Sequence, residues 1–235
     1  MFDLNRTGVR NLYVKPSNGA GAEQLLLESP QAKVPIDWSA DGRFLLYYSI
    51  DPQSDFDLWV LPLDGDGKPV VFLKTNFAEY AGAFSPDGRW VAYQSNESGR
   101  FEIYVRSFVA PAVAGAAGSA AGGAAGGAAA NGAGAQWQVS TAGGITPRWR
   151  PDGRELYYLG PDGQMMAAPI AVMGATLAPG APVKLFDTRI YGGGVDSRLG
   201  SQYDVTRDGR FLINTVLDEA AASITLIQHW APQTK

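Results

Sequence analysis

The sequence predicts an all-β fold: a β-propeller of four-stranded antiparallel blades. We expect about four full or nearly full blades plus an orphan outer strand pair, which makes a partial propeller. Two observations carry this prediction. A pattern in which an apolar strand end meets an Asp-Gly-Arg turn and a second apolar strand occurs four times. Each copy is followed by further short strand-like segments and turns, with no helical periodicity.

The repeated turns mark the blades. Asp-Gly supplies the left-handed backbone geometry that reverses two antiparallel strands. The turns stand at Asp41-Gly42, Asp87-Gly88, Asp152-Gly153 and Asp208-Gly209. Their aspartates are 46, 65 and 56 residues apart, and the first spacing matches the ~40–45 residues of a four-stranded blade. We attribute the two longer spacings to insertions.

The chain opens with an incomplete unit and continues with two blades. Residues 1–29 hold two orphan outer strands, at 11–16 and 24–28, because no Asp-Gly turn precedes them. The blade at 30–75 has predicted strands at 36–39, 44–49, 57–61 and 70–74. The blade at 76–141 has predicted strands at 82–85, 90–95, 102–106 and 137–141.

An Ala/Gly tract at 109–135 interrupts the second of these blades. It has almost no bulky side chain to bury, so we expect a flexible surface loop. A third blade follows at 142–188, with strands at 147–150, 155–159, 164–170 and 183–187 and a loop around 172–182. The last, incomplete blade at 189–235 has a loop around 192–200 and strands at 202–206, 211–216 and 223–228.

Two arrangements of the blades, a closed ring and an open arc, are compatible with this strand count. Propellers avoid exposed sheet edges by sharing one blade between the two chain ends. In one arrangement the strand at 24–28 completes the last blade and gives a four-bladed ring. In the other, upstream blades of a larger propeller are missing and the chain is an open arc. We favour the arc, because residues 11–28 read as the back half of a blade.

Composition excludes several classes of function. The 235 residues are 46% hydrophobic, which is enough for a sizeable core. The net charge is −4 and no basic stripe is present, so nucleic acid is not expected as a partner. Cysteine is absent, which removes disulfides and thiolate metal sites. No apolar run approaches ~20 residues, and residues 1–10 lack the apolar core of a signal peptide, so we expect no direct membrane insertion.

The sequence offers no assembled catalytic or metal site. Its single histidine, His229, would have to serve any Ser-His-Asp site, yet no Gly-x-Ser-x-Gly elbow is present. We interpret His229 as an end-of-strand side chain. The stretch Asp64-Gly65-Asp66-Gly67 has the oxygen-rich character of a calcium loop but lacks the closing glutamate, and we interpret it as a turn. We therefore expect no enzyme activity, no cofactor and no metal from this chain.

The repeat itself selects candidate binding residues. The position three residues before each turn aspartate holds a large apolar group, as expected for packing between blades: Trp38, Phe84, Trp149 and Val205. The position one residue earlier is polar and variable: Asp37, Ala83, Arg148 and Asp204. Innermost strands line the channel of a propeller, so Asp37, Arg148 and Asp204 are candidates for ligand contact. The alternative role is an ion pair or hydrogen bond between blades. The turn aspartates recur too evenly for one active site, and we expect them to cap backbone amides.

Several segments resemble the TolB-type, WD-repeat-like propeller family. They are Asp57-Leu58-Trp59-Val60-Leu61-Pro62-Leu63-Asp64-Gly65, residues 84–105 with Ser85-Pro86-Asp87-Gly88-Arg89 and Glu102-Ile103-Tyr104-Val105, and Ser140-Thr141-Ala142-Gly143-Gly144. Within this family they are most similar to the C-terminal propellers of bacterial serine/threonine kinases. Gly-His and Trp-Asp dipeptides of WD repeats are absent, and so are all kinase motifs.

The resemblance implies a non-catalytic sensor that binds a protein, a peptide or a small ligand. It also implies an extracytoplasmic or periplasmic domain of a bacterial membrane protein, in which any kinase domain belongs to a longer parent. Two alternatives stay open. The chain is the propeller gate of a peptidase or hydrolase whose catalytic domain is absent, or it is a periplasmic TolB-like scaffold.

Overall fold

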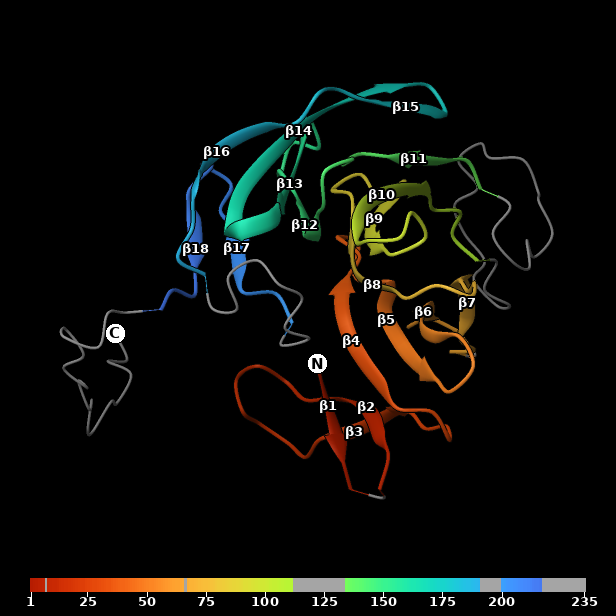
Figure 1. The fold of residues 1–235 in the computed structure, drawn as a ribbon. Coiled ribbons are helices and arrows are strands. Elements are labelled where there is room, and N and C mark those ends of the chain that lie inside the picture. Colours follow the sequence, from red (N-terminus) through yellow and green to blue (C-terminus); the bar gives the residue numbers. More distant parts are fainter. Residues whose placement is uncertain (7, 66, 112–133, 191–199, 217–235) are drawn as a thin grey trace, which may run out of the picture.

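The structure is an arc of antiparallel β-sheets (Figure 1). It is a computed structural model, and it describes residues 1–6, 8–65, 67–111, 134–190 and 200–216. Strands that follow one another in the chain pair within each sheet, so short turns connect them. The sheets stand side by side, and β4, β8, β12 and β17 are the innermost strands around a common centre. The predicted all-β, partial propeller fold is confirmed.

Two four-stranded sheets form the middle of the arc. Blade I contains β4 (Lys33–Trp38), β5 (Phe44–Asp51), β6 (Asp55–Pro62) and β7 (Val70–Leu73). Blade II contains β8 (Glu79–Phe84), β9 (Trp90–Ser95), β10 (Glu102–Ser107) and β11 (Gln136–Gln138). Residues 112–133, which include most of the Ala/Gly tract, lie outside the described residues.

Blade III carries an arm that the sequence analysis does not predict. Its strands are β12 (Ile145–Trp149), β13 (Glu155–Leu159), β14 (Gln164–Met173) and β16 (Val183–Asp187), with a single 3₁₀ turn at Pro161–Gly163. The expected loop around 172–182 is instead a hairpin, because the far end of β14 pairs with β15 (Thr176–Pro179). Leu177 on β15 is 3% exposed and packs in the core shared by blades II and III, which explains why this segment is ordered as a strand.

The two ends of the arc are shorter sheets. The N-terminal sheet contains β1 (Phe2–Asn5), β2 (Arg10–Val14) and β3 (Gln24–Leu27). Strand β1 is an addition to the predicted orphan pair. Blade IV contains β17 (Tyr203–Val205) and β18 (Phe211–Ile213), and the predicted strand at 223–228 lies outside the described residues. Strand β3 pairs with β2 and is not part of the β17–β18 sheet, so the closed four-bladed alternative is wrong for the described residues.

The Asp-Gly turns share one backbone hydrogen bond, in which the glycine N–H donates to the carbonyl of the residue two positions before the aspartate. In blade II, the Ser85 hydroxyl donates to the Asp87 carboxylate at 2.5 Å, and the Arg89 backbone N–H donates to the same oxygen at 3.1 Å. Gly88 has a φ of 67°, the left-handed region that glycine adopts without steric cost. The equivalent glycines have φ values between 73° and 82°: Gly42, Gly153 and Gly209. The turn sequence thus fixes the hairpin between each innermost strand and the next.

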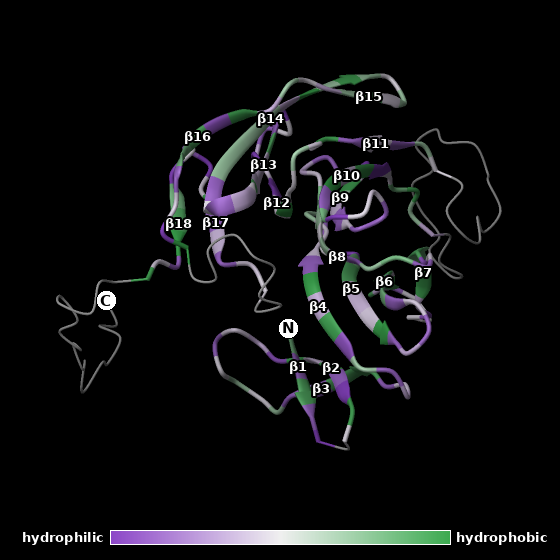
Figure 2. Cartoon of the chain, viewed as in Figure 1, coloured by the Kyte–Doolittle hydropathy of each residue, from purple (hydrophilic) through white to green (hydrophobic). Residues whose placement is uncertain are grey.

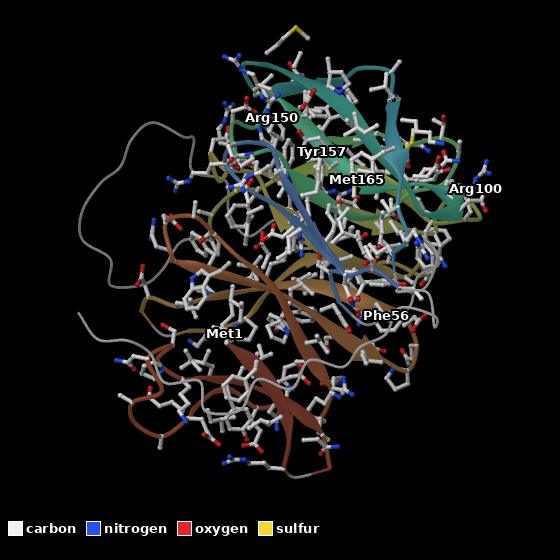
Figure 3. All side chains as sticks on the ribbon, turned by 90° about the vertical axis from the view of Figure 1, so that its left-hand side faces the viewer. Met1, Phe56, Arg100, Arg150, Tyr157 and Met165 are labelled. Carbon is white, nitrogen blue, oxygen red and sulfur yellow. The ribbon has the colours of Figure 1, made fainter. Side chains whose placement is uncertain are left out.

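One apolar residue is fully buried at the same place of the repeat in the N-terminal sheet and in blades I, II and III, on strands β2, β6, β10 and β14. These residues are 0% exposed: Leu12, Leu58, Ile103 and Met165. Figure 2 shows the hydrophobic stretch of β4 bounded by hydrophilic ends. Figure 3 shows Met165 and Tyr157 among the side chains packed between the sheets, with Arg100 at the rim. The core is therefore a series of apolar layers between neighbouring blades, as a propeller requires.

Candidate functional site

Bulges in the innermost strands position the candidate binding residues. The pairing register shifts between Pro35 and Asp37 in β4, between Tyr80 and Ala83 in β8, and between Ile145 and Arg148 in β12. A bulge bends a strand locally and redirects the side chain that follows it. Asp37, Ala83 and Arg148 directly follow these bulges. Two bulges contain a residue with positive φ, Ala81 and Thr146, which no sequence pattern predicts.

The three predicted binding residues line one cavity at the centre of the arc. The cavity has a volume of about 780 Å³, and Asp37, Arg148 and Asp204 are among its lining residues. Ala83, the fourth residue at this repeat position, lines it too. The rim includes Leu212 and Asn214 of blade IV, which the sequence analysis does not single out. The volume is in the range of small-molecule and peptide sites.

Asp37 is anchored to the neighbouring blade. Its Oδ2 accepts a hydrogen bond from the Phe84 backbone N–H at 2.7 Å, which joins β4 of blade I to β8 of blade II. Burial raises the pKa of this carboxyl group above its ordinary value, and the Phe84 hydrogen bond and the charge of Arg148 oppose that rise. Asp37 therefore fits the alternative role of a hydrogen bond between blades while it also lines the cavity.

Arg148 has spare hydrogen-bonding capacity. Its side chain is partly buried, and its Nη1 donates to the Pro147 carbonyl at 3.3 Å. Within the described part of the chain, no carboxylate lies within the 4.0 Å of an ion pair with this guanidinium. A guanidinium has five N–H donors, so most of those of Arg148 are available to a ligand.

Blade IV completes the site with Asp204 and Tyr203. Asp204 is exposed, and its Oδ1 accepts a hydrogen bond from the Val205 backbone N–H at 2.8 Å. The buried Tyr203 hydroxyl donates to the Thr146 carbonyl of β12 at 2.7 Å, which holds blade IV against blade III. Burial also raises the pKa of Tyr203 far above its ordinary value, so the hydroxyl keeps its proton. Within the described residues, Asp204 forms no ion pair with another blade.

The neighbouring apolar position of the repeat departs from expectation at one blade. Phe84 and Trp149 are each 7% exposed, and the Trp149 indole N–H donates to the Ala83 carbonyl of the preceding blade at 3.1 Å. Trp38 is 42% exposed, so the expected blade-to-blade packing is wrong for this residue. The sheet that precedes blade I contains three strands and presents no innermost strand equivalent to β8. Trp38 therefore lacks the surface on which Trp149 packs.

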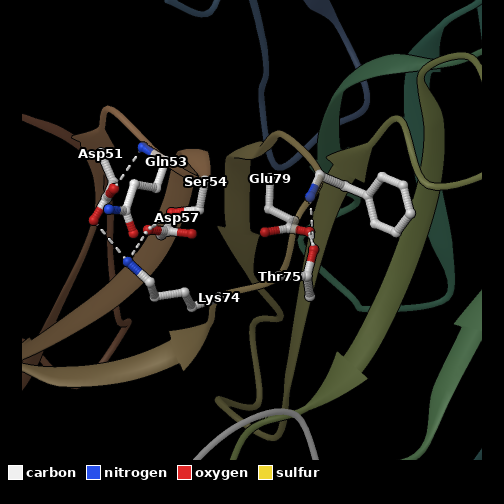
Figure 4. A network of polar contacts seen from close by, with 8 residues as sticks. Asp51, Gln53, Ser54, Asp57, Lys74, Thr75 and Glu79 are labelled. Atoms are coloured by element: carbon white, nitrogen blue, oxygen red, sulfur yellow. Dashed lines mark hydrogen bonds and ion pairs between the residues drawn. The ribbon is translucent and has the colours of Figure 1, made fainter.

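A second polar cluster lies at the junction of blades I and II (Figure 4). Lys74 Nζ lies 2.8 Å from Asp51 Oδ2 and 3.0 Å from Asp57 Oδ2. Glu79, on the facing blade, accepts a hydrogen bond from the Thr75 hydroxyl. Asp57 and Glu79 are both 0% exposed. Burial, reinforced by the charge of Asp57, raises the pKa of Glu79 to about 7.

The structure describes only part of the residues considered for metal and acid–base chemistry. Across the described residues, no group of three or more His, Asp or Glu side chains is arranged to hold a metal ion. Asp64 pairs with Arg43 at 3.1 Å, and Asp66 and His229 lie outside the described residues. No helix in the described ranges has the length and apolar character needed to span a membrane.

Comparison with known proteins identifies the fold. No family model and no curated protein matches the sequence. Among solved structures, the chain is similar to a protein assigned as TolB from Agrobacterium tumefaciens, with a TM-score of 0.52, 20% identity and coverage of 77% of this chain. It is also similar to TolB from Acinetobacter baumannii, with a TM-score of 0.56, 15% identity and coverage of 87%.

The match does not extend over the whole of those proteins. The chain spans 59% of the Agrobacterium structure and 42% of the Acinetobacter structure. A prolyl endopeptidase structure matches at a TM-score of 0.44 and 15% identity, over 77% of this chain and 25% of that one. At 20% and 15% identity, the likeness to the two TolB structures concerns the fold alone, and it agrees with the arc of blades described above. The chain has the fold of a TolB-type β-propeller.

Proposed function

We propose that the chain is a non-catalytic binding propeller that holds a protein, a peptide or a small ligand in the central cavity. The observation that carries this proposal is the convergence of Asp37, Arg148 and Asp204 from three blades on one cavity of about 780 Å³. The uncommitted guanidinium of Arg148 and the exposed carboxylate of Asp204 supply ionic and hydrogen-bonding groups without a nucleophile–base pair.

We further propose that this binding serves either a sensor domain or a scaffold. The Ser-Pro-Asp-Gly-Arg and Glu-Ile-Tyr-Val segments support a sensor linked to a bacterial serine/threonine kinase. The likeness to TolB structures supports a TolB-like scaffold in the periplasm. Both roles place the chain outside the cytoplasm and use the same cavity, so one binding experiment addresses them together.

The test is selection of ligands on the immobilised 235-residue chain from a displayed peptide library, followed by affinity measurement with single variants. We expect Arg148→Gln and Asp204→Asn each to weaken the selected ligand about tenfold, the loss of one charge-assisted contact. Arg154→Gln is the matched control, because Arg154 is an exposed arginine of blade III that does not line the cavity. Failure to select any ligand, or equal affinity for all four proteins, would contradict the proposal.

A further inference from the structure

We propose that the ligand of the central cavity is a mixed-charge peptide segment, in which an acidic side chain binds Arg148 and flanking basic side chains bind Asp204 and Asp37. This inference rests on the proposed binding function and specifies the chemistry of its partner. It follows from the order of charges around the cavity, from the unused hydrogen-bonding capacity of Arg148 and Asp204 and from the character of the rim.

The order of charges is set by the order of the blades. From blade I to blade IV, the innermost strands present Asp37, Ala83, Arg148 and Asp204 to the cavity. A positive group therefore lies between two negative ones, separated from Asp37 by a small apolar side chain. The three charges act on one another, since Arg148 lowers and Asp204 raises the pKa of Asp37. The complementary ligand carries the reverse order: positive, negative, positive.

Arg148 selects for the acidic group. Its partners in the described part of the chain leave most of its N–H donors unused, whereas six other arginines there form ion pairs: Arg6, Arg10, Arg43, Arg100, Arg150 and Arg210. A planar guanidinium binds a carboxylate through two parallel hydrogen bonds. A ligand that covered Arg148 without a hydrogen-bond acceptor would remove water from the guanidinium and put no hydrogen bond in its place, which costs binding free energy.

The two carboxylates exclude a purely anionic ligand. Asp37 and Asp204 outnumber Arg148, so a ligand with only negative charge is repelled overall. Asp204 is the more available partner for a basic side chain, because it is exposed and one of its oxygens has no hydrogen bond within the described residues. The ligand therefore needs a negative group to pair with Arg148 and positive groups to pair with Asp37 and Asp204.

The rim suits the long stem of a basic residue. Leu212 lines the cavity and is 74% exposed, which is unusual for a large apolar side chain. Lysine and arginine cover apolar surface with their aliphatic stems while their charged ends reach a carboxylate. Leu212 and Asp204 belong to paired strands, with Asp204 opposite Leu212 in the β17–β18 register. A lysine of the ligand can therefore pack its aliphatic stem on Leu212 while its ammonium group pairs with Asp204.

The experiment compares capped, amidated five-residue peptides by fluorescence anisotropy on the 235-residue chain. We expect Gly-Lys-Glu-Lys-Gly to bind at least about tenfold more tightly than Gly-Glu-Lys-Glu-Gly or Gly-Lys-Gln-Lys-Gly. A further arm carries the carboxylate as a free C-terminus, in Gly-Lys-Gly. Tighter binding of Gly-Lys-Gly than of Gly-Lys-Glu-Lys-Gly would assign Arg148 to a chain terminus and overturn the proposal of an internal acidic side chain.

Variants separate this inference from the proposed function. Arg148→Glu should reverse the preference, so that Gly-Lys-Lys-Lys-Gly binds more tightly than Gly-Lys-Glu-Lys-Gly, whereas Arg154→Glu should leave the order unchanged. Circular dichroism checks that each variant is folded. If library-selected ligands lose affinity on Arg148→Gln while the charged series shows no preference, the charge pattern is wrong and cavity binding stands. If no ligand depends on Arg148 or Asp204, both proposals are wrong.

Discussion

Glu79 shows what a single buried acid does to this fold. Its side chain is 0% exposed at the junction of blades I and II, opposite the Asp57 carboxylate and the Lys74 ammonium group that neutralises Asp57. Thr75 supplies its hydrogen bond. Because burial penalises the charged form, the pKa of Glu79 rises from 4.5 to about 7. The residue is therefore protonated in mildly acidic solution and charged in alkaline solution.

We predict that Glu79→Gln stabilises the chain at pH 8 by about 1–3 kcal/mol and has little effect at pH 4. Between its unfolded pKa of 4.5 and its folded pKa of about 7, the folded state binds more protons than the unfolded state. The stability that Glu79 contributes is thus present below pH 4.5 and lost as the pH rises through 7.

Urea unfolding from pH 4 to pH 8 measures the free energy of unfolding of wild type and variant at each pH. Asp187→Asn, at a carboxylate whose side chain is 70% exposed, is the control. A parallel pH profile for wild type and Glu79→Gln would contradict the assignment.

The sequence also predicts the site at this scale, but only in part. The repeat alignment selects Asp37, Arg148 and Asp204, and the structure brings them to one cavity. Tyr203 and Leu212 are missed, because they do not occupy the aligned position. The direction of the cavity side chains depends on the bulges. Two bulges have positive φ at Ala81 and Thr146, which the sequence does not reveal because neither residue is a glycine. These conformations are set by contacts between blades that are distant in sequence.

At the scale of the element, the Asp-Gly hairpin is the unit that sequence specifies best. In three turns the aspartate accepts the backbone N–H of the arginine that follows the glycine, and in the fourth the Thr206 hydroxyl accepts it. All four turns have a glycine with left-handed φ. Such a hairpin is specified by its own residues and does not depend on contacts with distant parts of the chain. Strand β1 and the β15 arm have no turn of this kind, and the sequence analysis misses both. Strand β15 is ordered by burial of Leu177 against other blades, a long-range contact that a local pattern does not contain.

We predict that Gly88→Ala destabilises the chain by about 1–2 kcal/mol. The effect is purely conformational, because nothing lies within 4 Å of an added Cβ and the φ of 67° disfavours alanine. Gly88→Asn is the matched variant, and it should cost less, since asparagine tolerates this conformation. Thermal unfolding followed by circular dichroism gives both values. Equal destabilisation by alanine and asparagine would contradict the assignment of the effect to the φ of residue 88.

At the scale of the whole molecule, equivalent residues differ because the arc has ends. Trp149 has a blade in front of it and is 7% exposed, whereas Trp38 faces a sheet without an innermost strand and is 42% exposed. The sequence places both residues at one position of the repeat and cannot distinguish them. Their environments depend on how many strands stand on each side, which is a property of the assembled arc.

We predict that Trp149→Ala costs about 3–5 kcal/mol and Trp38→Ala less than about 1 kcal/mol of unfolding free energy. Trp149 loses nearly its whole buried surface and its hydrogen bond to the Ala83 carbonyl. Trp38 loses less buried area, because it is 42% exposed, together with its exposed hydrogen bond to the Gly42 carbonyl. Denaturant unfolding of the two variants side by side provides the comparison. Comparable losses would mean that Trp38 is covered in solution.

The β15 arm has a consequence for how blades II and III are held together. It is paired to blade III, yet its Leu177 lies in the core with Val105 and Val139 of the neighbouring blade II, and Arg89 reaches across to the Gly174 carbonyl at its tip. Separating these two blades must expose Leu177, a penalty of about 2 kcal/mol beyond that of the facing sheets. The arm thereby adds contacts that hold blade III to blade II, beyond those made by the facing sheets themselves.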